Sequence, residues 1–123
     1  MLRHKSIYDP VEADDGYRVL VMVVVRDPEI FKQHAYHQWM RSLGPRRDSL
    51  QRWWDGAITT EEFYAEYRRD VSPRALERLR ALERKHGTVT VLCRERYPDP
   101  CHRYELVRLY QERYHTQAEE NAP

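Results

Sequence analysis

Two cysteines, and a histidine next to one of them, are the side chains of this 123-residue chain best suited to nucleophilic chemistry. Cys93 ends a run of β-branched residues, and Cys101-His102-Arg103 opens a helical pattern just beyond it. Free backbone N–H groups and the helix dipole favour negative charge in a first helical turn, so we expect the Cys101 thiol to have a lowered pKa. Glu95 is suited to act as a general base. The candidate catalytic residues are therefore Cys93, Glu95, Cys101 and His102.

Arginines supply the charge for a possible ligand. Arg26 and Arg96 follow the two strongest strand patterns, and Arg103 lies in the first turn of the last helical pattern. Guanidinium groups bind carboxylates and phosphates bidentately, so we expect a small phosphate- or nucleotide-like anion as the ligand. The chain has 21 basic residues, 18 of them Arg, against 20 acidic ones, and its net charge of +1 argues against a dedicated nucleic-acid binder. With four glycines, it has no Gly-rich phosphate loop, and no cofactor is expected.

Other interpretations of the cysteines remain open. Cys93 fits a small buried hydrophobic residue, and Cys101-His102 fits an ordinary helix start. A zinc site is not expected, because the Cys-x7-Cys-His spacing matches no standard finger or ribbon and adjacent residues rarely point at one metal. A phosphatase-type loop after Cys93 is disfavoured because Pro98 and Pro100 lack backbone donors. A Cys93–Cys101 disulfide is conceivable as a redox switch.

Two strands must position these groups. The continuous apolar runs Val19–Val25 and Thr88–Cys93 are typical of strands buried on both faces, and Ser6–Tyr8 is a weaker third strand. Ligands of open α/β sheets bind beyond the carboxyl ends of the strands. Parallel pairing would therefore bring Arg26 and the Cys93–Arg96 segment to one edge of the sheet.

Helical patterns occupy the long excursion between the two strands. Phe31, Ala35, Trp39 and Leu43 recur every four residues and predict a helix from Pro28 to Leu43. Further helices are predicted at 45–55, after the capping box Thr59–Glu62, from Ser72-Pro73 to Gly87, and from Asp99-Pro100 onwards. We predict one α/β domain, residues 1–115, with a small, mostly parallel sheet flanked by helices, followed by a flexible polar tail at 116–123.

Composition limits the setting and the partners. The longest apolar run is far shorter than the roughly 20 residues that span a bilayer, and the N-terminus lacks a signal-peptide pattern, so we expect a cytoplasmic protein with no membrane contact. The alternative to ligand binding is a non-enzymatic interaction module. It would use the aromatic residues of the helical cover, Trp53, Trp54 and Tyr64, to contact a protein or nucleic acid, and a homodimer is one such arrangement.

The chain also resembles a known family. The segments that carry the resemblance are Tyr8–Pro10, Asp15–Val21, Trp39–Pro45, Leu50–Trp53, Phe63-x3-Tyr67-Arg68, Val91–Glu95 and Cys101–Arg103. They are similar to the YeaO-like branch of the domain-of-unknown-function 488 family, over residues 7–113. The resemblance implies a small cytoplasmic α/β protein of bacterial or archaeal type without an established activity. It also implies site positions at Arg26, Cys93, Glu95, Cys101, His102 and Arg103.

One departure from that family concerns the first long strand. The wider family has Asp-Val-Arg near its end, whereas this chain has Val24-Val25-Arg26. The missing carboxylate removes the obvious acid or base of that strand, and Asp27 is the nearest substitute.

Overall fold

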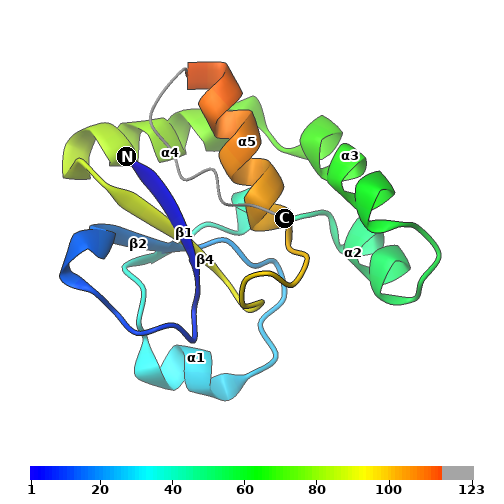
Figure 1. The fold of residues 1–123 in the computed structure, drawn as a ribbon, viewed down its shortest axis with the longest axis horizontal. Coiled ribbons are helices and arrows are strands. Elements are labelled where there is room, and N and C mark those ends of the chain that lie inside the picture. The colour runs from blue at the N-terminus through cyan, green and yellow to red at the C-terminus, as the bar shows by residue number, and fades with distance from the viewer. Residues whose placement is uncertain (115–123) are drawn as a thin grey trace.

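A four-stranded parallel sheet forms the centre of the protein in a computed structural model that describes residues 1–114 (Figure 1). Its strands are β1 (Leu2–Ser6), β2 (Tyr17–Leu20), β3 (Gln38–Trp39) and β4 (Val89–Cys93), in the order β1-β4-β2-β3. All three pairings are parallel. The predicted α/β class with a small parallel sheet is thus confirmed.

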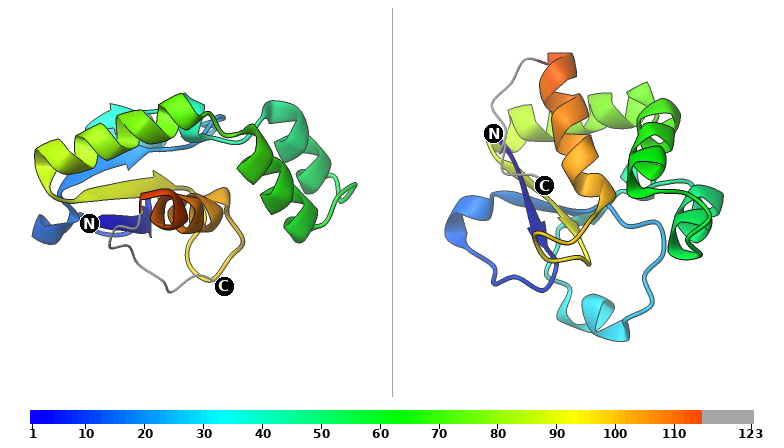
Figure 2. Two further views of the ribbon diagram at one scale, coloured as in Figure 1. Left: turned by 90° about the horizontal axis from the view of Figure 1, so that it is seen from above. Right: turned by 45° about the vertical axis from the view of Figure 1, so that its right-hand side comes forward.

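Helices cover the sheet and extend beyond it. They are α1 (Pro28–Gln33), α2 (Arg47–Trp54), α3 (Thr60–Asp70), α4 (Pro73–His86) and α5 (His102–Tyr114), with 3-10 turns η1 (Ala13–Asp15) and η2 (Arg41–Leu43). Helices α2 and α3 lie beyond the end of the sheet toward which β4 points (Figure 2). The carboxyl ends of the central strands therefore face a helical cover.

Side chains alternate between the two faces of the sheet, as the period of a strand requires. Val19 and Val91 point into a core formed with α4 and α5, whereas Leu20 and Leu92 join Ile30 of α1 on the other face. Both central strands are buried on both faces, which is why they appear in the sequence as continuous apolar runs.

Local capping signals place the middle helices where the sequence predicts them. The Thr59 side chain accepts from the Glu62 backbone and completes a capping box at α3. The Ser72 side chain accepts from the backbone N–H groups of Arg74 and Ala75 at the start of α4, and Gly87 ends that helix with a positive φ of 82°. The predicted tail, 116–123, lies outside the described residues.

The helix predicted from Pro28 to Leu43 is wrong beyond its second turn. His34 adopts the left-handed conformation and ends α1, and Gln38–Trp39 then pairs with β2 as an edge strand. Backbone pairing with the sheet thus overrides the helical spacing of the apolar residues.

The strand predicted over Val19–Val25 is too long at its carboxyl end. It pairs with β4 only as far as Leu20, and Val21 donates the last backbone hydrogen bond to Leu92 O, at 2.9 Å. Beyond this point β4 ends at Cys93, so the following valines have no neighbouring strand. The Trp39 indole donates to Met22 O instead, at 2.7 Å.

None of the helices described here combines the length and apolar character that a bilayer crossing would need.

Candidate functional site

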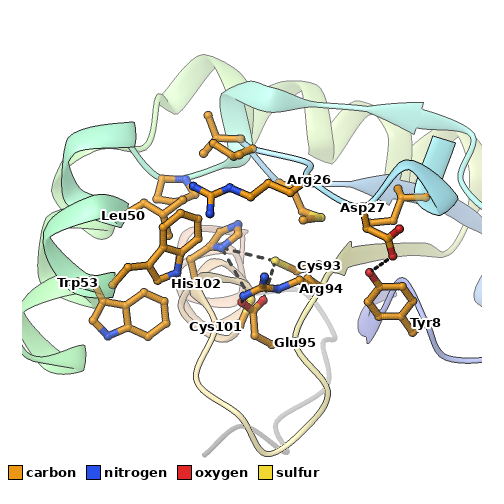
Figure 3. A pocket seen from close by; sticks show the side chains of 16 residues that line it. Tyr8, Arg26, Asp27, Leu50, Trp53, Cys93, Arg94, Glu95, Cys101 and His102 are labelled. Atoms are coloured by element: carbon orange, nitrogen blue, oxygen red, sulfur yellow. Dashed lines mark hydrogen bonds and ion pairs between the residues drawn. The ribbon is translucent and has the colours of Figure 1, made fainter. Parts of the chain in front are cut away.

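A cavity of about 340 Å³ lies beyond the carboxyl ends of β2 and β4 (Figure 3). Most of its wall comes from the segment after β2, the end of β4 and the segment after it, helix α2, and the start of α5, and Tyr8, Ile30 and Pro45 complete it. The lining residues are Tyr8, Met22, Val23, Val24, Arg26, Asp27, Ile30, Pro45, Leu50, Trp53, Trp54, Cys93, Arg94, Glu95, Cys101 and His102. The cavity occupies the position that the topology rule for α/β sheets predicts for a ligand.

Tertiary contacts hold the loop between β4 and α5 against this cavity. The Cys101 backbone N–H donates to the Tyr64 hydroxyl of α3, at 3.2 Å. Arg103 donates to the Glu95 carbonyl, at 2.6 Å. These contacts bring the start of α5 back beneath the end of β4, so residues 93 and 101 become neighbours.

Cys93, Cys101 and His102 form one cluster, defined here as the Cys–His cluster. His102 Nδ1 lies 3.9 Å from Cys93 Sγ and 3.8 Å from Cys101 Sγ. The other ring nitrogen, Nε2, lies 2.9 Å from the carbonyl oxygen of Val21. Because a carbonyl only accepts, Nε2 carries a proton, and Nδ1 faces the two sulfurs. Cys93 Sγ also lies 3.3 Å from Glu95 Oε2.

The two thiols differ in acidity. The hydrogen bond with Cys101, burial and the nearby Glu95 carboxylate raise the pKa of Cys93 well above its ordinary value. Burial opposes ionisation of Cys101 too, but the hydrogen bond from Cys93 and the charges of His102 and Arg103 outweigh it, so the pKa of Cys101 lies well below its ordinary value. The two pKa shifts have opposite directions because each thiol is the other's hydrogen-bond partner.

The structure separates the arginines that the sequence groups together. Arg26 lines the cavity, and its guanidinium lies over the Trp54 ring, 4.8 Å from the centroid. Arg94 also lines it and lies 3.4 Å from Glu95 Oε1. Arg96 is not a lining residue; its side chain is 66% exposed and lies beside Asp9. Arg103 is buried behind the loop and does not line the cavity either.

The cavity wall also includes Asp27, the nearest substitute for the missing carboxylate, and residues that no sequence pattern assigns to a site. Val23 and Val24 form part of the wall because the chain has left the sheet there. Asp27 caps α1 and accepts from the Tyr8 hydroxyl at 2.6 Å, so a residue near the N-terminus closes one side of the cavity. The Asp27-Pro28 capping signal marks the aspartate, but nothing local marks Tyr8, since its contact crosses 19 residues of sequence.

The aromatic residues expected to form an interaction surface have intramolecular partners. The Trp53 indole donates to Thr60, at 3.0 Å, and its ring stacks on Phe63. Trp54 contacts Arg26, and the Tyr64 hydroxyl accepts from Cys101. The two tryptophans form the helical side of the cavity.

A family model described as the inactive DUF488-N3 subclade matches residues 1–123. The chain belongs to this DUF488 subclade. The match confirms the resemblance to the 488 family, to which the YeaO-like proteins belong. No curated protein and no solved structure shows a significant match.

Proposed function

We propose that this DUF488 protein binds a small anionic ligand with a planar or apolar portion, of the size of a mononucleotide, without converting it. The observation that carries the proposal is the pair of arginines, Arg26 and Arg94, which follow two different strands and line one mainly apolar cavity. Cavities of this kind, with a few charged groups among apolar walls, are typical of small-molecule sites.

The guanidinium of Arg26 supports an anion, since the other charged side chains of the wall, Asp27, Arg94 and Glu95, already have polar partners. Within residues 1–114, the Arg26 guanidinium forms no ion pair, and its one interaction is with the face of the Trp54 ring. Its donors can therefore bind a phosphate or carboxylate without first losing an acidic partner. Arg94 has a distant partner in Glu95, at 3.4 Å, which a ligand oxygen would replace or share.

The walls support a planar or apolar portion. Trp53, Leu50 and Pro45 come from the helical cover, opposite the valines that follow β2. Aromatic and branched side chains favour a flat heterocycle or a short apolar chain over a bare inorganic ion.

Absence of turnover is supported by three observations. The subclade is described as inactive. Val24 lines the cavity, and the resemblance to the wider family implies an aspartate at this position there. Both thiols are nearly inaccessible, with Cys93 5% and Cys101 1% exposed, whereas a nucleophilic thiol must reach its substrate.

Titration calorimetry on the reduced, metal-free protein tests the proposal, with inorganic phosphate, nucleoside monophosphates and short-chain carboxylates as probes. We expect at least one organic anion to bind, and Arg26→Ala and Arg94→Ala each to weaken it by about 10-fold or more, as the loss of a charge-assisted hydrogen bond requires. Arg78→Ala removes the same charge from an exposed face of α4 and should leave the affinity unchanged. Equal weakening by all three variants, or no binding of any probe, would contradict the proposal.

A further inference from the structure

The Cys–His cluster places three metal-binding atoms close together. Cys93 Sγ, Cys101 Sγ and a ring nitrogen of His102 all lie within 4.8 Å of one another, and all three residues are buried. They come from the end of β4 and the start of α5. Thiolate sulfur and imidazole nitrogen together favour zinc over magnesium or calcium, which prefer oxygen.

The distances between these atoms approach those of a tetrahedral site. With Zn–S bonds of about 2.3 Å and Zn–N bonds of about 2.0 Å, sulfur and nitrogen ligands of one zinc ion lie roughly 3.5 Å apart. The two sulfur–nitrogen distances here are 3.9 and 3.8 Å. Shifts of a few tenths of an ångström would bring both sulfur–nitrogen pairs to that distance.

The histidine is already oriented for this task. Metal-bound histidines usually donate their second ring N–H to a carboxylate or a backbone carbonyl, which fixes the tautomer and the ring. His102 has this arrangement: Nε2 donates to Val21 O at 2.9 Å, and Nδ1 faces both sulfurs.

Cys101 and His102 can contact one metal ion although they are adjacent in the sequence. Consecutive residues within a helix point about 100° apart, but α5 begins at His102, so Cys101 is outside the helix. Its side chain can therefore turn toward the same point as its neighbour, and the contact between Cys101 Sγ and His102 Nδ1, at 3.8 Å, shows that it does.

We propose that Cys93, Cys101 and His102 bind one Zn²⁺ ion, with a fourth coordination position open to the cavity. All three ligands line that cavity, so a water molecule can occupy the fourth position. The two thiolates would balance the charge of the ion. This inference goes beyond the proposed anion binding and does not depend on it.

A zinc titration of the tag-free, reduced protein against a chromophoric chelator tests the site. We expect one equivalent to bind, and Cys93→Ser, Cys101→Ser and His102→Asn each to lose about 100-fold or more in affinity. His34→Asn changes an exposed histidine outside the cluster and should retain wild-type affinity. Asn tolerates the left-handed backbone at that position, so the control should fold.

A measurement on the wild type keeps the test independent of how the variants fold. Co²⁺ should give the thiolate charge-transfer absorption and intense visible bands of a tetrahedral sulfur site. The inference is wrong if the wild type does not bind zinc under reducing conditions, or if the cobalt spectrum has no thiolate bands. It is also wrong if the folded serine variants bind zinc as tightly as the wild type. Because anion binding is measured on metal-free protein, the two proposals can fail separately.

Discussion

Arg103 is a buried cation that supports the candidate site from behind. It is 1% exposed, donates to the Glu95 carbonyl at 2.6 Å and lies 4.9 Å from the centre of the Tyr104 ring. It also donates to His4 Nδ1, at 3.4 Å, and so connects the loop after β4 to β1. The place of Arg103 in the first turn of α5 predicts that it binds an anion. In the structure it positions the loop that carries Glu95 instead.

Arg103→Ala tests this structural role. The change leaves the Glu95 carbonyl without its donor and removes a large, well-packed side chain, so we expect a loss of about 3 kcal/mol in the free energy of unfolding. Urea denaturation followed by circular dichroism measures the loss. The matched variant Arg78→Ala, on the exposed face of α4, should change stability by less than about 0.5 kcal/mol. Equal effects of the two variants would contradict the role assigned to Arg103.

At the scale of elements, the entry into β2 depends on a glycine. Gly16 has φ 65° and ψ −134°, and a Cβ atom there would lie 2.3 Å from the carbonyl oxygen of Thr88. That oxygen accepts the Tyr17 N–H at 2.9 Å. The close approach of the two segments, together with the positive φ, permits only glycine.

Replacing two glycines separates backbone strain from this close contact. Gly56→Ala meets strain alone, because φ is 75° and nothing lies within 4 Å of its Cβ, so we expect a loss of about 1 kcal/mol. Gly16→Ala meets both strain and a collision with backbone, and should lose about 3 kcal/mol or more. Thermal and urea unfolding of both variants checks the order. Similar losses would show that β2 can move away from Thr88 at little cost.

The elements that the sequence predicts well are those with local signals. The caps at Thr59 and Ser72 lie next to the helices that they begin, so α3 and α4 are predicted within a few residues. The elements predicted wrongly depend on distant partners. Strand β3 exists because Gln38–Trp39 pairs with β2, and the segment after Val21 leaves the sheet because β4 ends.

In the candidate site, too, the features with local sequence signals are predictable and those that depend on distant contacts are not. The carboxyl ends of parallel strands meet at one edge of the sheet, which brings Arg26 and Cys93 together, and the start of α5 adds Cys101 and His102. The tautomer of His102 depends on Val21, across 81 residues, and no sequence pattern indicates it. The opposite orientations of Arg94, toward the cavity, and Arg103, away from it, depend on how the loop folds back.

At the scale of the whole molecule, a buried charge connects the N-terminal segment to the sheet. Asp15 is 0% exposed and accepts from Lys5 of β1 and from Arg18 of β2. The Glu12 backbone N–H also donates to it, at 3.0 Å. Burial alone would raise the pKa of this carboxyl, but the hydrogen bonds and the two cations outweigh burial and hold the pKa below its ordinary value of 3.8.

The lowered pKa fixes the sign of a pH effect. The unfolded state binds the proton of Asp15 more tightly than the folded state does. Ionised Asp15 therefore stabilises the protein fully above the unfolded pKa of 3.8. This contribution is lost as the pH falls through the lower folded pKa. Asp15→Asn should therefore be less stable than wild type by about 3 kcal/mol at pH 7, since the buried Arg18 loses its carboxylate partner and Lys5 keeps only Glu12. The difference should shrink below about pH 4. Urea unfolding at a series of pH values measures it, with Asp14→Asn, whose side chain is 74% exposed, as the control expected to remain close to wild type throughout. A difference that stays constant from neutral to acidic pH would mean that the Asp15 network stabilises the fold through its shape and not through its charge.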